Sequence, residues 1–264
     1  MSKLKLIWKF FMINVRQNLE YRLNATIGTI AIALTNIPSI IFFWIIFSNI
    51  PTLNGWGIGE ILFMVGIGAL AHGTFHTFFS GVSGWQIEQL IRQGNMDRIL
   101  LKPLSVIPHL AMEGSFDVDG LGDIISGLII IFITSNMLGL QWNIFNSSLL
   151  VLFVLSSAVI IASFHLIIGT LSFWVTRSGA LIDLFYTVMR FGEYPLDIYN
   201  LSTKIMLTVI IPVGFINYYP AQIFLGKGLW VPAAYLTPVV AIIMYAIAHR
   251  FWDYGLKHYT STGS

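Results

Sequence analysis

Two histidines in one apolar segment have the spacing that a metal site on a helix would need. His72 and His76 stand four residues apart in "GALAHGTFHTFF", and this spacing can place two imidazoles on one helix face. The chain has no cysteine, and no carboxylate accompanies the pair in this segment. The pattern therefore favours helix contacts or a wet cavity over a metal site.

The sequence contains no motif typical of phosphate binding or of nucleophilic catalysis. The glycine-rich piece "LGKG", Leu225 to Gly228, has neither the spacing nor the hydroxyl residue of a phosphate-binding loop. Serine, histidine and aspartate all occur, but no nucleophile-elbow motif brings them together. We therefore expect a non-catalytic chain that binds no cofactor of its own.

Charged side chains gather in one short stretch, Ile87 to Leu110, although only 10% of all residues are charged. Two interpretations are open for this stretch. It can be a solvated loop, or it can be a docking surface on which mixed charges give specificity for a partner. The charged residues of interest are Glu88, Arg92, Asp97, Arg98 and Lys102, and Trp85 stands just before the stretch.

The same stretch contains its own helix breakers. Residues 85–93 can form a short helix, which Gly94 and Asn95 can end. Pro103 and Pro108 then prevent a straight helical continuation. We expect a folded elbow over residues 85–104.

Small and polar residues mark helix faces where backbones can approach. The segment that holds the two histidines presents small side chains at intervals of three or four residues, which favours helix packing, with a subunit interface or a substrate path as the alternatives. Upstream, Asn36 and Pro38 favour a kink, which could line a pathway or be an ordinary irregularity. The small residues are Ala69, Gly73, Thr77, Ser80 and Gly84.

Composition places these residues in a membrane protein. Of the 264 residues, 56% are hydrophobic, and the mean hydropathy is +0.79. The long apolar runs do not alternate with polar residues, which favours helices over a barrel. We expect an all-α polytopic protein with one domain over residues 1–264, in contact with membrane lipid and not with nucleic acid.

The runs predict an amphipathic interfacial helix followed by six spans, each of about 20 residues or more. The interfacial helix covers residues 2–22, with Leu4, Trp8 and Phe11 on its apolar face. The fifth span begins near Ile205 and passes Pro212. The other spans cover residues 25–47, 58–79, 121–140, 147–175 and 230–248.

The distribution of lysine and arginine sets the expected orientation. With these spans, all lysines and arginines except Lys227 lie on one side, and basic residues are retained in cytoplasmic loops. Both termini are therefore expected in the cytoplasm. The segment Ser178 to Phe191 is apolar but short, and it contains Asp183 and Arg190. We interpret it as an interfacial or cytosol-projecting helix.

The charged stretch and four later segments together resemble a known family. Its first part reads "IEQLIRQGNMDRILLKPLS", and the later segments read "FDVDGLGDIISGL", "EYPLDIYN", "VIIPVGFINYYPA" and "GLKHYTSTGS". In this order they resemble ABC (ATP-binding-cassette) type-2 exporter permeases, and are most similar to the daunorubicin-type and related export permeases. The resemblance touches nearly the whole chain.

This resemblance implies the expected interfacial helix and six spans, together with a coupling helix in the elbow that contacts separate cytosolic ABC ATPase subunits. Trp85, Glu88, Arg92, Asp97, Arg98 and Lys102 then become coupling candidates. ATP and Mg would bind the partner ATPase. The resemblance also implies a second permease subunit, identical or homologous, so that a heterodimer is an option, and a re-entrant or interfacial segment at Tyr218 to Gly228.

The expected function is that of a permease subunit of an ABC exporter in the bacterial inner membrane. Its substrate class is open among amphipathic, lipid-like, drug and glycan molecules. The alternative is an ATP-independent secondary transporter or channel, with His72, His76 or the acidic residues near the third span as proton-linked groups. An adjacent ATPase gene would favour the exporter.

Overall fold

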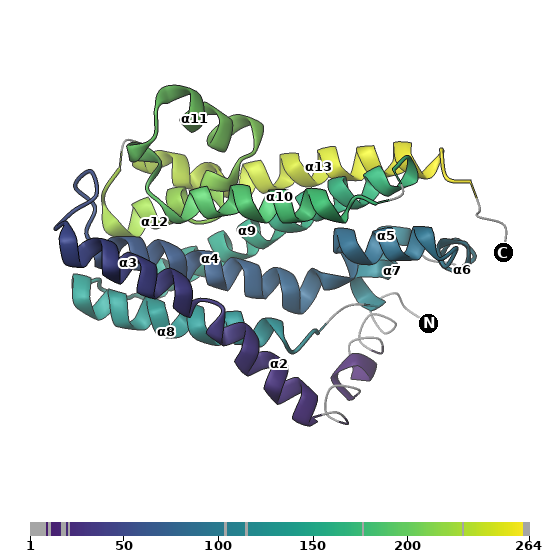
Figure 1. Cartoon of the computed structure of the whole chain (residues 1–264), viewed down its shortest axis with the longest axis horizontal. Helices are drawn as coiled ribbons and strands as arrows, with labels where there is room; N and C mark the ends of the chain where they lie inside the picture. Colours follow the sequence, from purple (N-terminus) through teal and green to yellow (C-terminus); the bar gives the residue numbers. More distant parts are fainter. Residues whose placement is uncertain are drawn as a thin grey trace.

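The computed structural model describes residues 9, 12–16, 20, 22–102, 105–113, 116–175, 177–228 and 230–260. Most of the predicted interfacial helix over residues 2–22 lies outside the described residues. In the described part, helices and helical turns form the bundle of Figure 1. The helices are α2 (Arg22–Leu34), α3 (Ile37–Asn49), α4 (Ile58–Phe79), α5 (Gly84–Arg92), α6 (Met96–Leu100), α7 (Val106–Glu113), α8 (Gly120–Leu138), α9 (Ile144–Thr170), α10 (Gly179–Arg190), α11 (Leu201–Ile205), α12 (Tyr218–Leu225) and α13 (Thr237–Leu256).

Five helical stretches among the described residues are long and apolar enough to cross a membrane. Their mean hydropathies run from 1.5 to 2.5, and they coincide with the predicted first, second, third, fourth and sixth spans. The sequence reading of these five is confirmed in type and place. The stretches are Arg22–Asn49, Ile58–Arg92, Gly120–Leu138, Ile144–Phe173 and Val231–Leu256.

The first of these stretches is interrupted where the sequence predicts a kink. Thr35 and Asn36 form a turn between α2 and α3, and Pro38 lies in the first turn of α3. Proline has no N–H to give to the preceding turn, so the helix restarts there in a new direction. The break leaves Asn36 facing α8 instead of lying within a continuous helix.

The predicted fifth span is wrong. Instead of one long helix from Ile205 past Pro212, the chain forms the short α11 and a π-helical turn, Met206–Ile210, which ends before Pro212. A 3₁₀ turn, Val213–Phe215, and α12 follow. Pro212 cannot continue the hydrogen-bond ladder of a helix. The chain therefore folds back at this point.

The segment read as an interfacial or cytosol-projecting helix is also corrected. It forms α10, which packs on α9 and α5 and runs back along the bundle (Figure 1). Beyond it, Glu193 bonds Ser39 of α3, and Asp197 bonds Trp56 next to the start of α4. Residues 179–198 thus pass from one end of the bundle to the other. The short length of the segment, with its Asp183 and Arg190, predicted a helix outside the membrane; both residues are exposed, and Arg190 also lines a cavity beside α3 and α4.

The centre of the bundle is α4, which packs along α8 on one side and α9 on the other. A Cβ at Gly73 would lie 2.7 Å from the backbone nitrogen of Ile124 and 2.8 Å from the carbonyl oxygen of Gly120. Only glycine allows two helix backbones to approach so closely. Of the predicted small residues, Gly73 and Thr77 are thus seated against α8.

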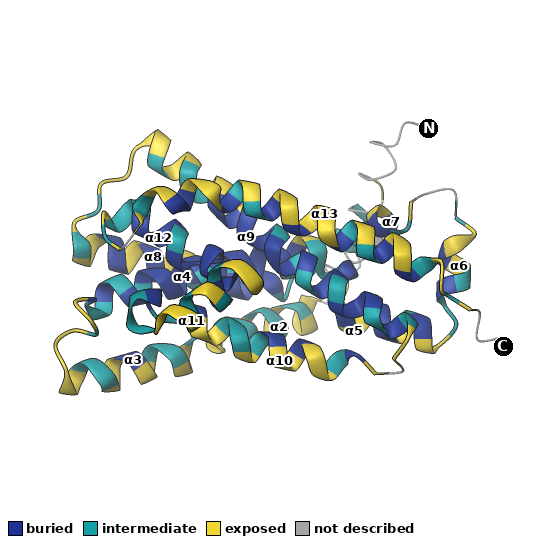
Figure 2. Ribbon diagram, turned by 90° about the horizontal axis from the view of Figure 1, so that it is seen from above, coloured by how far each residue is buried: buried dark blue, intermediate teal, exposed yellow. Residues whose placement is uncertain are grey.

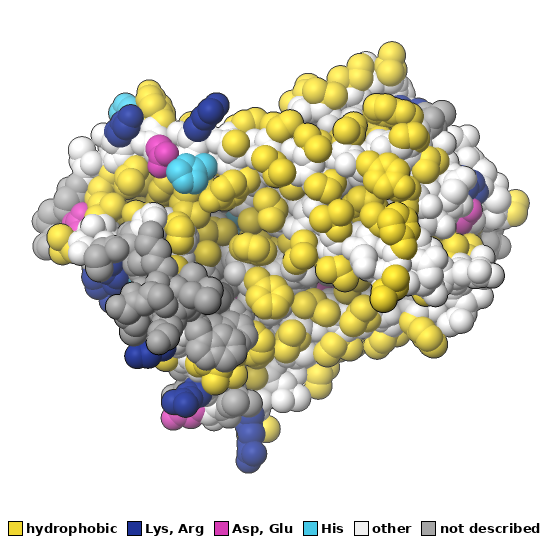
Figure 3. All heavy atoms as spheres, turned by 180° about the vertical axis from the view of Figure 1, so that it is seen from behind, with side chains coloured by type: hydrophobic (Ala, Val, Ile, Leu, Met, Phe, Trp, Pro, Cys, Tyr) yellow, Lys and Arg dark blue, Asp and Glu magenta, His cyan; other side chains and the backbone are white. Residues whose placement is uncertain are grey.

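The surface of the bundle has the polarity expected in a membrane. Buried residues concentrate on α4 and α9, whereas the outward faces of α3 and α13 are exposed (Figure 2). Large apolar side chains such as Phe132 and Val209 are each 71% exposed. In Figure 3 hydrophobic side chains cover the middle of the face, and Lys and Arg gather mainly toward the end that carries α5 and α6. Lipid contact explains this arrangement.

Candidate functional site

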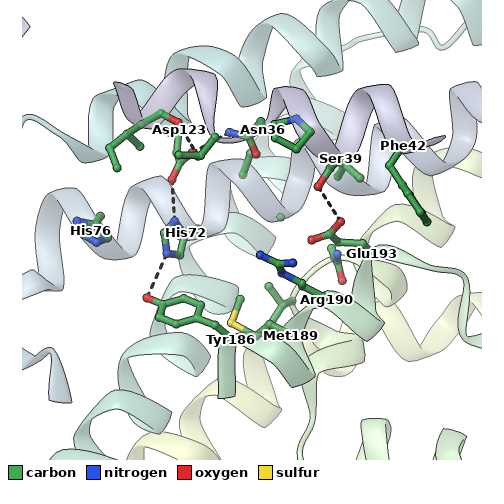
Figure 4. A pocket seen from close by; sticks show the side chains of 18 of the residues that line it. Asn36, Ser39, Phe42, His72, His76, Asp123, Tyr186, Met189, Arg190 and Glu193 are labelled. Atoms are coloured by element: carbon green, nitrogen blue, oxygen red, sulfur yellow. Dashed lines mark hydrogen bonds and ion pairs between the residues drawn. The ribbon is translucent and has the colours of Figure 1, made fainter. Parts of the chain in front are cut away.

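A cavity of about 770 Å³ lies between α3, α4, α8, α10 and the turn before α12. Aromatic and aliphatic side chains form part of its wall, and charged or polar groups from four helices form the rest (Figure 4). Few polar groups in an otherwise apolar hollow are typical of a ligand site. The polar lining includes Asn36, His72, Asp123, Tyr186, Arg190 and Glu193.

One wall of the cavity is organised by the carboxylate of Asp123, which is 4% exposed. One carboxylate oxygen lies 2.7 Å from His72 Nδ1, and the other accepts a hydrogen bond of 2.8 Å from Asn36 Nδ2. Asn36 Nδ2 also lies 3.0 Å from the hydroxyl of Ser126. A buried carboxylate needs such partners to remain in place. The kink in the first span is what brings Asn36 to it.

The opposite wall comes from α10 and the residues after it. Glu193 accepts a hydrogen bond of 3.1 Å from the hydroxyl of Ser39, and Arg190 lines the same hollow (Figure 4). Tyr194 packs edge-on against Phe42 and Phe43. The cavity therefore offers acidic, basic and aromatic surfaces within one space.

A chain of hydrogen bonds leads from the cavity wall to the start of α5. The hydroxyl of Tyr186 lies 3.2 Å from His72 Nε2 and 3.1 Å from His165 Nε2. On its other side, His165 Nδ1 accepts a hydrogen bond of 3.3 Å from the backbone N–H of Gly84. His165 is completely buried. These contacts join α4, α10, α9 and α5.

The two histidines of α4 bind separate carboxylates. His72 pairs with Asp123, whereas His76 Nδ1 lies 3.6 Å from Asp117. Burial alone would raise the pKa of the Asp117 carboxyl, but nearby His76 and the N–H of Asp119 lower that pKa below its ordinary value. Within the described residues, no group of three or more His, Cys, Asp or Glu side chains is placed to hold a metal ion.

The predicted elbow is a pair of short helices, α5 and α6, at the end of the bundle (Figure 1). Gly94, with φ +71°, follows α5 as the sequence predicts. The apolar sides of both helices, including Ile87 and Met96, are buried. The elbow is thus a fixed part of the bundle rather than a loose loop.

The charged residues of the elbow face in different directions. Arg92 and Arg98 are exposed. Glu88 is buried and accepts a hydrogen bond of 2.6 Å from the backbone N–H of Gly179, at the start of α10. Lys102 Nζ lies 2.7 Å from His109 Nε2, and Asp97 is partly buried. Only part of the predicted set is therefore free to meet a partner.

Trp85 and the small residues complete the predicted set. Trp85 is 40% exposed and stacks on Tyr186 with ring centroids 5.8 Å apart. Ala69 lines the cavity, and the carbonyl of Thr77 accepts the N–H groups of Phe116 and Asp117. Ser80 begins the 3₁₀ turn between α4 and α5. These small residues thus have different surroundings: the cavity, the chain before α8 and the turn before α5.

Several residues of the site were missed from the sequence. Tyr186, Arg190 and Glu193 lie in or just after the segment that was assigned to an interfacial helix. His165 carried a usable signal, because an ionisable residue inside a predicted span indicates a functional contact by default. Ser39 carried none, since an isolated serine is common in membrane helices.

Comparison with known proteins gives a family. Residues 33–263 match the family model described as "ABC-2 family transporter protein". No curated protein and no solved structure matches the chain. The matched range includes the whole elbow and all residues that line the cavity except Ile32 of α2.

Proposed function

The chain belongs to the ABC-2 family of transporter proteins, and from this premise we propose that it is an exporter permease whose substrate passes through the cavity and whose elbow docks on a separate ATPase. The family makes it a multi-pass membrane component of an ABC transporter. Direction of transport, substrate and docking site are parts of the proposal.

The observation that carries the proposal is the connection between elbow and cavity. Glu88 of α5 holds the first N–H of α10, and Trp85 of α5 stacks on Tyr186 of α10. The same α10 supplies Tyr186 and Arg190 to the cavity lining. Because helices are stiff, a force applied to α5 would displace a wall of the cavity.

Exposure within the elbow supports docking on its charged side. Its apolar side is packed into the bundle, and Arg92 and Arg98 face outward. An ATPase with acidic side chains at the matching positions would fit this surface. ATP and Mg would bind that partner, and the permease chain would perform no hydrolysis.

Orientation follows from the corrected path of the chain. Residues 179–198 lead away from the elbow end, α11 and α12 fold back at the opposite end, and α13 returns. Lys204 then joins Lys227 at the outer end, while Arg250 and Lys257 stay near the elbow. We place the elbow and both termini in the cytoplasm of a bacterial cell, with the chain in its inner membrane.

A second permease subunit, identical or homologous, belongs to the proposal. Across α2 and α3 only Phe43 is buried within the chain, so this stretch has an outer surface available to a partner as well as to lipid. The chemistry of the cavity wall suits an amphipathic substrate, and lipid-like, drug or glycan molecules remain the classes to assay. The daunorubicin-type branch stays an inference from resemblance.

The test reverses the exposed charges. In the complex with its partner ATPase, Arg92→Glu combined with Arg98→Glu should lower vanadate-sensitive transport by at least tenfold, since the new carboxylates would meet the proposed acidic side chains of the ATPase. Lys257→Glu, an exposed charge near the elbow end but outside it, is the matched control. Unchanged transport in the double variant would contradict docking at the elbow.

An ATP-independent transporter is the second candidate, and the His72–Asp123 pair in the cavity wall is the observation that favours it. It predicts substrate flux that follows a proton gradient in vesicles containing this chain without an ATPase. Flux that requires both the ATPase and ATP would exclude it.

A further inference from the structure

We propose that Gly84, His165, Tyr186, His72 and Asp123 form an oriented hydrogen-bond relay through which movement of the elbow changes the polar lining of the cavity. The inference rests on the proposed function, because an ATPase must move the elbow for the relay to operate. It assigns a positioning role to His165 and Tyr186, whereas Gly84 supplies the connection to the elbow.

The orientation of the relay begins at Gly84. Gly84 is the first residue of α5, and the N–H groups in the first turn of a helix have no acceptor within that helix. Its N–H donates to His165 Nδ1, at 3.3 Å. This nitrogen must therefore carry the lone pair, and neutral His165 bears its proton on Nε2.

The next two contacts follow from this assignment. His165 Nε2–H donates to the hydroxyl of Tyr186, at 3.1 Å. The tyrosine hydroxyl is then free to donate its own proton to His72 Nε2, at 3.2 Å. Since His72 accepts at Nε2, its proton lies on Nδ1 and is donated to Asp123, at 2.7 Å. One direction of donation satisfies all four contacts.

The carboxylate ends the chain in the cavity wall. Asp123 is an acceptor at both oxygens, one facing His72 and the other facing the amide of Asn36. It therefore closes the relay without needing a proton of its own. His72 and Asp123 both line the cavity, so the last bond of the relay is the one that a substrate would meet.

Aromatic contacts hold the relay in one geometry. Phe75 stacks on the ring of His165 with centroids 4.5 Å apart, and Phe185 meets the same ring edge-on. Trp85 stacks on Tyr186. The rings of His165 and Tyr186 are thus fixed in orientation, and Gly84 and Trp85 attach the relay to α5 at two points.

Movement of α5 would therefore act on the relay directly. Withdrawal of the Gly84 N–H leaves the buried Nδ1 of His165 without a donor, a state disfavoured by roughly tenfold or more. Displacement of Trp85 removes the ring that supports Tyr186. Both changes weaken the contact that orients His72 toward Asp123, and so alter the cavity lining.

The first test determines which ring nitrogen carries the proton in His165 and in His72. In protein labelled with ¹⁵N-histidine and held in lipid nanodiscs, His165 should be protonated on Nε2 and His72 on Nδ1, giving opposite patterns of ¹⁵N shifts. His72→Gln and His165→Gln variants assign the two signals. The same tautomer at both histidines would overturn the relay and leave the proposed function intact.

The second test measures whether movement of the elbow changes the cavity. The chain contains no cysteine, so an introduced cysteine is its single thiol. Thr35→Cys places a thiol in the cavity lining, and its alkylation rate is measured in the ATPase complex before and after vanadate trapping. Trapping should change this rate by about fivefold or more. Tyr186→Phe, which keeps the ring against Trp85, should abolish the change.

Tyr194→Phe is the matched control, because Tyr194 lines the same cavity but takes no part in the relay. It should respond to trapping as the Thr35→Cys parent does. A response that survives Tyr186→Phe would overturn the relay alone. A parent whose alkylation rate ignores trapping would overturn the proposed ATP-driven movement and the relay with it.

Discussion

At the outer end of the bundle, Lys227 forms an ion pair with Glu60. At the elbow end, the backbone N–H of Gly84 donates a hydrogen bond to a neutral histidine, His165. Lys227 Nζ lies 2.7 and 2.8 Å from the two oxygens of Glu60 and 5.2 Å from the ring centroid of Trp56. We call Lys227, Glu60, Trp56 and Asp197 the outer clasp. Trp56 Nε1–H extends the outer clasp by donating to Asp197, at 3.1 Å.

The two sets of contacts differ in strength: the outer clasp is suited to holding helices together, and the relay is suited to transmitting a movement. Charge-assisted, bidentate contacts such as those of Lys227 are stronger than neutral hydrogen bonds, so the outer clasp suits a contact that keeps α12 and the segment after α10 fixed to α4. The relay from Gly84 to Asp123 consists of neutral bonds except for the last one. Such bonds can be exchanged at lower cost.

The outer clasp also explains the exception in the charge distribution. Lys227 was the basic residue that the sequence left on the outer side, against the usual bias. Its side chain is 34% exposed, and it is paired with Glu60, which is 18% exposed. Pairing offsets the cost of a lysine beside the membrane.

Truncation of the relay should have the largest effect on stability. His165→Ala leaves the Gly84 N–H without its acceptor and a void beside Phe75, so we expect the free energy of unfolding in detergent to fall by about 3–4 kcal/mol. Thermal unfolding followed by tryptophan fluorescence would measure this loss. His249→Ala, on α13, where the histidine side chain is 45% exposed, should cost little, and an equal loss in both variants would contradict a special role for His165.

Removal of one charge from the outer clasp should have a smaller effect. Glu60→Gln keeps an oxygen to accept the N–H of Gly57 but leaves Lys227 without its anion. After allowance for solvent screening at these partly exposed groups, we expect a loss of about 1–2 kcal/mol, with transport retained. The control is Asp183→Asn, because Asp183 is an exposed carboxylate. A loss no greater than in this control would show that the outer clasp does not fasten the bundle.

The smallest expected effect is a difference in salt dependence between the outer clasp and the relay. The coupling energy between Glu60→Gln and Lys227→Met, from a double-mutant cycle, should fall by about 0.5 kcal/mol as ionic strength rises tenfold, because mobile ions screen exposed charge. The stability cost of Tyr186→Phe should stay constant, since His165, Tyr186 and His72 form neutral bonds. An equal salt dependence in the outer clasp and in the relay would contradict the proposed difference between charged and neutral contacts.

Much of the fold could be predicted from hydropathy and helix breakers alone. Five apolar stretches were found because about 20 apolar residues are needed to cross a bilayer. The elbow was found because glycine suits the left-handed conformation that ends a helix, as at Gly94, and because proline cannot continue the hydrogen-bond ladder of a helix. The kink before α3 followed from Pro38 for the same reason. Each of these features depends on local chemistry.

The path between α9 and α13 could not be found in this way. The short length of residues 178–191, with Asp183 and Arg190, predicted a helix outside the membrane, whereas α10 packs on α9 and α5, and Arg190 and Glu193 line the cavity. Conversely, the apolar run through Pro212 resembled a span but folds back on itself. Sequence periodicity records how polar a residue is, not which surface its neighbours will cover.

The sequence by itself determined that this chain is a helical membrane protein with a charged elbow, because the length and apolarity of a span and the breaking of a helix are properties of the local chain. Only the tertiary structure decided that Asn36, His72, Asp123 and Tyr186 meet in one wall, and that His165 connects them to Gly84. These groups lie far apart along the chain. Their hydrogen bonds exist only after helix packing has chosen which faces are turned inward.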